Sequence, residues 1–351
     1  MPVRRGLIAW SKTELPEATL NARIARAQAA MREAGLDALL LYTNNTRPAA
    51  VTWLSAFVPY FSDGILLLPR EGKSLLVVSM SKRVINWVIA TSYVGEVASG
   101  PRIGIEAGKR AAALGKRVGV AELAELPAGI TGDLAAHGLS LVDATALMDG
   151  LRSRADPAEI ALAGHAAAIA DHALARAAKP AADGAAAVAA VEEAARLMGA
   201  EEIFITLAAD LAREQAFRRR TGRPALGARY ALRVALAYKG IWVRSTRSFG
   251  GNPSSLAGAT ESFAAAVAGL PDGAGFKRMA SWLVEGCRIA QPLAPLMGSR
   301  VSEPRLPAPG SLVSVQACLT LDGEPVHIGA PALIGAPGEA AGLLVAPAAP
   351  G

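Results

Sequence analysis

Arginine is the residue type that dominates the stretch of this sequence best able to form a charged site. Arg233, Arg244 and Arg247 lie within residues 229–249, and Arg218 lies in the loop before them. A guanidinium group cannot ligate a metal ion, because its positive charge is fixed and it offers no lone pair. It binds carboxylates and phosphates through paired hydrogen bonds instead. If Arg233 and Arg244 point into one pocket, that pocket attracts small anions.

The segment that carries these arginines has the pattern of a β-hairpin. Residues 229–249 are rich in β-branched and aromatic side chains, and Lys239-Gly240 divides the segment into two halves of similar length. A Gly-containing pair between two alternating runs is a typical hairpin turn. Residues on facing strands can then share one face, although the pattern alone does not decide which arginines do so.

The hairpin resembles a segment of the creatinase, prolidase and aminopeptidase P family of pita-bread peptidases. In that family the segment reads approximately GD-x-V-x-x-D, then Y-x-G-Y-x-x-D-x-x-R-T-F. The matching positions here are Gly227, Val234, Tyr238, Gly240, Arg247 and Phe249. The two metal-binding aspartates of the family fall on Arg233 and Arg244. The resemblance therefore implies the fold of this family with a reversed charge at two metal-ligand positions.

The resemblance extends to the other metal-ligand positions of the family. Its GHG…HExP segment best matches residues 294–304, so that the metal-binding histidine falls on Pro295 while the acidic residue remains as Glu303. The closing glutamate of the family falls on Gln316. One of five implied ligands is left, because a divalent metal needs carboxylate or imidazole donors. We therefore expect no catalytic metal and no other cofactor.

The periodicity predicts two domains. Helix 17–35 and helix 83–90 alternate with predicted strands at 36–42, 65–68, 74–79, 102–105, 117–120 and 140–142. This alternation predicts an α/β domain at residues 1–150, and the resemblance implies that it is of the creatinase N-terminal type. Predicted helices at 158–177, 182–198 and 257–269 flank the hairpin, and the resemblance implies a further helix at 279–291 and an α+β pita-bread domain over residues 151–335. Residues 336–351, rich in Gly, Ala and Pro, are predicted to form a disordered tail.

Composition limits the classes of partner. The chain has 351 residues, 52% of them hydrophobic, and a net charge of +6 with 5% aromatic residues. The modest charge and few stacking side chains do not favour nucleic acid. No apolar run is long enough for a signal peptide or a membrane span, and two cysteines suggest a reducing compartment. We expect a cytoplasmic protein with no nucleic acid or membrane partner, and the resemblance implies a homodimer.

Two functions remain open at this point. The first is a metal-independent enzyme that acts in a hydrolase-like or lyase-like manner on a small carboxylate-bearing molecule derived from an amino acid or amide; an enzyme of a specialised biosynthetic route is one form of this hypothesis. Its expected catalytic residues are Glu303 and His327, and its expected substrate-binding residues are Arg233, Arg244, Arg247, Arg218, Tyr238 and Gln316. The second is a catalytically dead pseudopeptidase that binds or scaffolds, in which acidic residues neutralise the arginines as an internal plug. An active metalloaminopeptidase is not expected under either hypothesis.

The N-terminal domain could contribute to the pocket as well. In the family, this domain helps to roof the active site. The residues here that fall at such positions are Asn44, Asn45, Trp53, Phe57, Tyr60 and Phe61. The alternative is that these aromatic side chains belong to the core of the domain.

Overall fold

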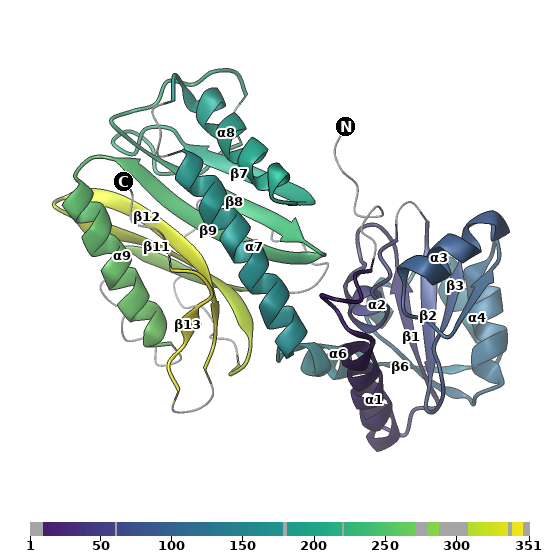
Figure 1. The fold of residues 1–351 in the computed structure, drawn as a ribbon. Coiled ribbons are helices and arrows are strands. Elements are labelled where there is room, and N and C mark those ends of the chain that lie inside the picture. The colour runs from purple at the N-terminus through teal and green to yellow at the C-terminus, as the bar shows by residue number, and fades with distance from the viewer. Residues whose placement is uncertain are drawn as a thin grey trace. The chain divides into compact units, whose positions relative to one another are not determined.

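The chain folds into two units in this computed structural model (Figure 1). The structure describes residues 10–59, 62–177, 181–219, 221–270, 279–287, 308–335 and 339–346. The first unit comprises residues 1–153 with 289–291, and the second comprises residues 154–288 with 292–351. None of the helices in the described ranges is long and apolar enough to cross a membrane.

The N-terminal unit is built on a mixed sheet of six strands in the order β4-β3-β2-β1-β5-β6. Its strands are β1 (Ala38–Thr43), β2 (Gly64–Pro69), β3 (Leu75–Val78), β4 (Glu96–Ser99), β5 (Arg117–Val120) and β6 (Ser140–Asp143). Its helices are α1 (Glu17–Glu33), α2 (Ala49–Ser55), α3 (Ile85–Thr91), α4 (Ile103–Ala112), α5 (Ala128–Ala135) and α6 (Thr145–Arg152), with short 3-10 turns at Lys82–Val84 and Leu123–Glu125. The predicted α/β N-terminal domain is therefore confirmed.

One prediction for this unit was wrong. Residues 102–105, expected as a strand, begin helix α4, and the neighbouring strand is β4. Ile103, Ala107 and Ala111 recur at helical spacing and are all buried against the sheet together with residues of α5. A four-residue window showed only an apolar run, whereas the period of the helix appears over the longer segment.

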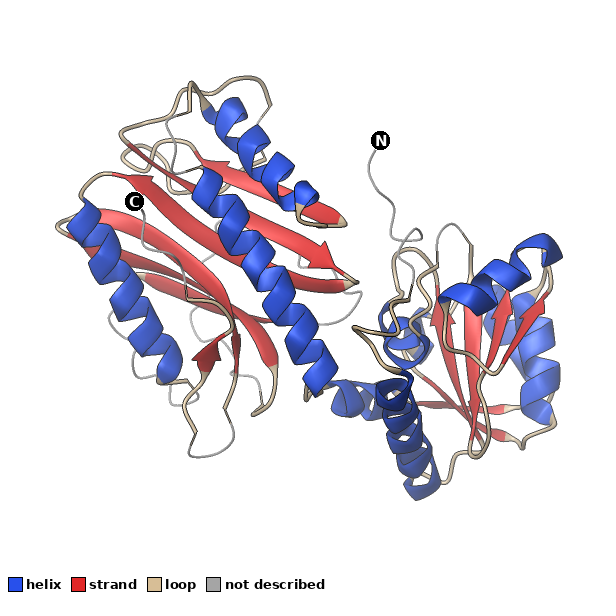
Figure 2. Cartoon of the chain, in the orientation of Figure 1, coloured by secondary structure: helices blue, strands red, loops and turns tan. Residues whose placement is uncertain are grey.

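The C-terminal unit is a continuous β-sheet of hydrogen-bonded strands, and its helices pack on one face of the sheet, as Figure 2 shows. Its strand order is β10-β11-β12-β9-β8-β7, and β13 pairs with β12. The strands are β7 (Glu202–Ala208), β8 (Arg229–Tyr238), β9 (Ile241–Gly250), β10 (Ser281–Gly286), β11 (Leu312–Leu321), β12 (Glu324–Leu333) and β13 (Gly342–Leu343). The helices are α7 (Pro157–Arg176), α8 (Gly184–Leu197) and α9 (Pro253–Ala268).

Local signals explain how this unit is laid out. Helix α7 begins at a capping box, in which Asp156 accepts a hydrogen bond from the Glu159 backbone and Glu159 reaches back to the backbone of Asp156. Lys239 and Gly240 both have positive φ angles, of 47° and 79°, which form the predicted tight turn between β8 and β9. Helix α7 packs on β8 and β9, and α9 packs on β11 and β12.

Two sequence predictions for this unit need correction. Within the predicted helix 279–291, residues 281–286 form strand β10, which pairs with β11, and residues 288–291 lie outside the described residues. In the predicted disordered tail, Gly342–Leu343 form β13 against Ala332 and Leu333, and the neighbouring Ala341 is buried. Both segments form strands because they pair with apolar residues of neighbouring strands. Those neighbouring residues are distant in the sequence, so a local sequence window does not contain them.

Candidate functional site

The register of the β8–β9 hairpin separates its three arginines. Arg233 lies opposite Thr246, and Arg244 lies opposite Ala235, whereas Arg247 lies opposite Leu232. Side chains alternate between the two faces of a strand, and directly paired residues share a face. Arg233 and Arg244 therefore point to one face, and Arg247 points to the other.

The face that carries Arg247 is covered by helix α7. The Arg247 guanidinium forms an ion pair with Asp171 of this helix, and the Tyr238 ring lies 4.3 Å from the imidazole of His165. Burial lowers the pKa of Arg247, and the Asp171 carboxylate opposes that shift. The expectation that Arg247 and Tyr238 line a pocket together with Arg233 is therefore corrected, because both belong to the packing of α7.

The opposite face of the sheet gathers polar side chains from several strands, and we call it the polar face. By register, it carries Arg233, Arg244, Thr246, Glu285, Ser314, Gln316, Cys318 and His327. Glu285 pairs with Ser314, Gln316 pairs with Gly329, and Gly329 pairs with Thr246, so one face is continuous from β10 to β9. Of the residues expected at the site, Arg233, Arg244, Gln316 and His327 come together here.

Arg244 is held in a buried ion pair. Its side chain is 1% exposed, and one of its terminal nitrogens donates to the carboxylate of Glu285 in β10. Burial lowers the pKa of Arg244 and raises the pKa of Glu285, and each partner opposes the shift of the other. The backbone N–H of Arg244 donates to the Ser314 hydroxyl at 2.8 Å. The charge of Arg244 is thus compensated at close range.

Arg233 has no comparable compensation within the described residues. Its Nε donates to the Thr246 hydroxyl at 3.1 Å, and its guanidinium lies 3.9 Å from the ring centre of Phe217. No carboxylate of the described part of the chain forms an ion pair with it. Burial, and then the charge of Arg244, lower its pKa to about 10, so it remains protonated at neutral pH. The charge of Glu285 opposes this shift, but Glu285 forms its ion pair with Arg244, so these three side chains together carry a net positive charge.

Gln316 links the two arginines through a chain of hydrogen bonds. The Thr246 hydroxyl donates to its Oε1 at 2.5 Å, and its Nε2 donates to the Arg244 carbonyl at 3.2 Å. The amide occupies space that Gly329 leaves open, since a Cβ at Gly329 would lie 2.3 Å from Oε1. Gln316 therefore orients Thr246, which in turn fixes Arg233.

His327 lies at the other end of the polar face as a neutral imidazole. Burial, and then the charge of Arg233, lower its pKa to about 4. Its Nε2 lies 3.9 Å from the Cys318 sulfur, and the Phe217 ring meets the imidazole edge-on at 5.1 Å. Burial raises the pKa of Cys318 to about 11, so the pair is a thiol beside a neutral imidazole.

The remaining predicted site residues lie elsewhere or outside the described ranges. The Arg218 side chain is half exposed and forms an ion pair with Glu214, and the Arg218 backbone is hydrogen-bonded to Leu207 at the edge of the sheet. Arg218 therefore does not lie with Arg233 at the site. Glu303 lies outside the described residues. Sequence reasoning missed Glu285 because its segment was read as a helix. As a strand, the same segment places Glu285 on the polar face by alternation.

The described residues of the polar face do not offer a ligand set for a divalent metal. Its charged members are two guanidinium groups and one carboxylate, and that carboxylate is already bound to Arg244. The described residues contain no group of three or more His, Cys, Asp or Glu side chains that could hold a metal ion. Two nearby cations would also repel a third.

The residues of the N-terminal unit that were expected to roof the active site do not form one group. Some belong to the core of the unit, and others lie in a loop. Trp53 and Phe57 are buried in the unit, as the core alternative proposed, and Tyr60 and Phe61 lie outside the described residues. Asn44 follows β1, and its side-chain oxygen accepts from the backbone of Thr46 and Arg47.

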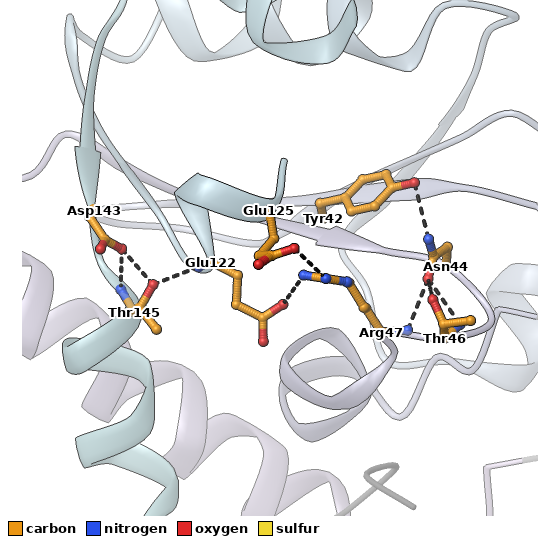
Figure 3. Close-up of polar contacts among 8 residues, drawn as sticks. All are labelled: Tyr42, Asn44, Thr46, Arg47, Glu122, Glu125, Asp143 and Thr145. Carbon is orange, nitrogen blue, oxygen red and sulfur yellow. Dashed lines mark hydrogen bonds and ion pairs between the residues drawn. The ribbon is translucent and has the colours of Figure 1, made fainter. Parts of the chain in front are cut away.

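Asn44 belongs to a polar network at the carboxyl ends of β1, β5 and β6, drawn in Figure 3. Arg47 reaches from the loop after β1 to two carboxylates that follow β5, Glu122 and Glu125. Asp143, at the end of β6, accepts from Thr145, and these bonds lower its pKa. The groups in this network bind one another.

Comparisons with known proteins agree with this architecture. Residues 23–154 match the family described as Creatinase/Prolidase N-terminal domain. No curated protein sequence matches the chain. Similar solved structures include an Xaa-Pro dipeptidase from Bacillus anthracis, with TM-score 0.69 and 17% identity over 93% of this chain and 97% of that one. The prolidase from Pyrococcus horikoshii OT3 has TM-score 0.69 and 18% identity, with coverages of 92% and 98%.

A His350Ala form of Escherichia coli aminopeptidase P is also similar, with TM-score 0.66 and 13% identity over 92% of this chain and 94% of that one. At these identities the likeness establishes the fold alone. The chain thus has a creatinase/prolidase-type N-terminal domain followed by a domain with the pita-bread fold of the prolidases and aminopeptidase P, as the sequence resemblance implied.

Proposed function

We propose that the polar face binds a small carboxylate-bearing molecule, derived from an amino acid or an amide, and that it works without a catalytic metal. One observation carries this proposal: Arg233 keeps a protonated guanidinium that no described carboxylate pairs with. Of its nitrogens, Nε is committed to Thr246, and the ring of Phe217 supports the plane of the group. A planar fork of donors fixed in this way matches the two oxygens of a carboxylate.

The chemistry of the neighbouring groups supports metal independence. Arg233 and Arg244 stand where the resemblance implies metal-binding aspartates, and Glu285 is engaged by Arg244. With two positive charges and one negative charge among these three side chains, the net field attracts anions and opposes divalent cations.

Catalysis, if the bound molecule is turned over, falls to His327 and to the carboxyl groups near the arginines. His327 is neutral at pH 7, because its pKa is about 4, so it can accept a proton only weakly. Glu285 has a raised pKa, which brings it nearer to the range useful for a general acid or base. Glu303 keeps the catalytic role proposed for it from the sequence. We propose a lyase-like or hydrolase-like step as the reaction class.

A second candidate is a pseudopeptidase that serves as a binding or scaffolding protein. The Arg244–Glu285 ion pair favours it, since this pair occupies hydrogen-bonding groups that a substrate would need. Both candidates predict no turnover of Xaa-Pro peptides, with or without added Mn²⁺ or Co²⁺. They differ in whether any small carboxylate is consumed.

Calorimetric titration with glycine, succinate and inorganic phosphate tests the proposal. Wild-type protein should bind at least one of the carboxylates. Arg233→Gln should weaken that binding by at least about thirtyfold, because loss of a desolvated charge partner typically costs about 2–5 kcal/mol. Arg218→Gln is the matched control, since its side chain is half exposed and paired with Glu214. Equal affinities for wild-type and Arg233→Gln protein would refute the proposal.

A further inference from the structure

A thiol and an imidazole lie side by side on the polar face. Cys318 of β11 and His327 of β12 are directly paired in the register of the sheet, so their side chains project from the same face. The Cys318 sulfur lies 3.9 Å from Nε2 of His327. A thiol beside an imidazole is the pairing of nucleophile and base that thiol-dependent acyl transfer uses.

Phe217 connects this pair to Arg233. Its ring meets the His327 imidazole edge-on at 5.1 Å, and the Arg233 guanidinium lies 3.9 Å from the centre of the same ring. The charge of Arg233 also acts at His327, since it is the second cause, after burial, that lowers the pKa of this imidazole. The guanidinium that the proposed function assigns to a carboxylate and the Cys318–His327 pair therefore lie around one aromatic ring.

The thiol is in contact with a side chain that reaches solvent, although the pair itself is buried. Cys318 is 3% exposed and His327 is 8% exposed. Gln215, in the loop after β7, is exposed, and its Oε1 lies 4.0 Å from the Cys318 sulfur. Movement of the Gln215 side chain would therefore bring a small molecule to the sulfur.

We propose that Cys318 is the nucleophile of a hydrolase-like step on the polar face, and that His327 is its general base. The substrate class is an amide that carries a carboxylate. The role of Cys318 rests on the proposed carboxylate site at Arg233, because that site would hold the substrate beside the thiol. The reaction needs water and no other co-reactant.

The proton passes between the same two side chains in both halves of this reaction. As the Cys318 sulfur attacks the amide carbon, Nε2 of His327 takes the thiol proton. The carbon–nitrogen bond then breaks, and His327 gives the proton to the leaving amine. Water attacks the resulting thioester while His327 takes a proton from it, and the carbon–sulfur bond breaks as the thiol is reprotonated. The products are a carboxylic acid and an amine.

The resting pair is neutral, and this decides when the proton moves. Burial raises the pKa of Cys318 to about 11, and burial followed by the charge of Arg233 lowers the pKa of His327 to about 4. A thiolate therefore does not form in the free protein at neutral pH, and the proton moves as the sulfur attacks. A carboxylate bound at Arg233 would offset the second cause of the His327 shift, so the bound substrate would make this imidazole a stronger base.

Alkylation of the full-length protein with iodoacetate and with iodoacetamide tests this role. Iodoacetate carries a carboxylate, and iodoacetamide is its neutral analogue of nearly the same size. Peptide mass mapping follows Cys318 and Cys287 separately, and Cys287, which is also buried, is the internal control. In wild-type protein, iodoacetate should label Cys318 at least about tenfold faster than Cys287. This comparison needs no variant.

Three variants divide the roles of the neighbouring groups. His327→Gln should slow the labelling of Cys318 by iodoacetate about a hundredfold, because general-base assistance typically contributes that much. Arg233→Gln should slow labelling by iodoacetate at least about thirtyfold and should not slow labelling by iodoacetamide. Arg218→Gln, whose half-exposed side chain is paired with Glu214, is the matched control and should label like the wild type. Thermal melts show which variants are folded.

The outcomes separate the role of Cys318 from the carboxylate site. If Arg233→Gln labels like the wild type while His327→Gln remains slow, the thiol–imidazole pair stands and the carboxylate site at Arg233 is refuted. If Cys318 in wild-type protein is labelled no faster than Cys287 while calorimetry shows a carboxylate bound at Arg233, the nucleophile is refuted and the proposed function stands. Equal labelling of wild-type and folded His327→Gln protein would overturn the role of His327.

Discussion

Removal of the Glu285 carboxylate offers a sharp test of the electrostatics of the polar face. In Glu285→Gln, Arg244 would remain 1% exposed without its ion-pair partner, beside a second cation at Arg233. Breaking a buried pair from one side costs about 3–5 kcal/mol. Because the Glu285 side chain is 16% exposed, we take the lower end, about 3 kcal/mol. For a unit of this size, that corresponds to a fall in Tm of roughly 6–12 °C.

The same variant should gain affinity for anions while it loses stability. Without the negative charge of Glu285, the two arginines of the polar face would attract phosphate or a dicarboxylate more strongly, and a ligand that binds the native state stabilises it by mass action. At about 100 times its Kd, a ligand contributes about 2.7 kcal/mol, which would restore most of the loss. Thermal melts of Glu285→Gln with increasing phosphate, at constant ionic strength, would measure this recovery.

Asp171→Asn is the matched control for this experiment. It removes the acid of the other buried pair, Asp171–Arg247, on the helix-covered face. It should also lower Tm, because it leaves Arg247 buried and unpaired. Phosphate should not restore its Tm to the same extent. If phosphate rescues both variants equally, or if Glu285→Gln melts like the wild type, the assignment of a cationic polar face is wrong.

Two further predictions follow from the same groups. Elemental analysis after dialysis should find less than stoichiometric Mn, Co, Zn or Fe, because arginines stand at two positions where the resemblance implies metal ligands, and a near-stoichiometric metal would refute this. The His327 imidazole has a pKa of about 4 when folded and about 6.5 when unfolded, so the unfolded state binds the extra proton first as pH falls. Stability should therefore decline by up to about 3 kcal/mol between pH 6.5 and pH 4. Chemical denaturation across this range should show the decline in wild-type protein and a smaller one in His327→Gln.

The sequence predicted those parts of the fold that depend on local pattern. Lys239-Gly240 specified the turn of the hairpin, and the capping pair Asp156 and Glu159 marked the start of α7. Segments whose structure depends on distant partners were misread. The resemblance implied a helix over residues 281–286, whereas pairing with β11 makes them a strand. That single error hid Glu285, the residue that neutralises Arg244.

The sequence predicted most of the residues that form the candidate site, but only part of their arrangement on the sheet. Arg233, Arg244, Gln316 and His327 do share one face, since strand alternation is regular once the pairing is known. Arg247 was misplaced because it was grouped with Arg233 and Arg244 by residue type, before strand alternation was applied to its position. Its separation from Arg244 by three residues puts it on the opposite face of the same strand.

The structure also shows why arginine at positions 233 and 244, where the resemblance implies metal-binding aspartates, does not disturb the core. Positions 233 and 244 point to the polar face, whereas the apolar core around α9 is built from residues of the opposite parity, such as Val313 and Val315. A change of charge at 233 and 244 therefore costs no apolar packing, and its cost is electrostatic. Glu285 offsets one of the two positive charges at close range. The other stays on Arg233, where hydrogen bonding to Thr246 and contact with Phe217 hold it in a fixed orientation. A half-buried charge that is oriented but has no carboxylate in an ion pair with it is costly to the free protein, and an anionic ligand would reduce that cost on binding.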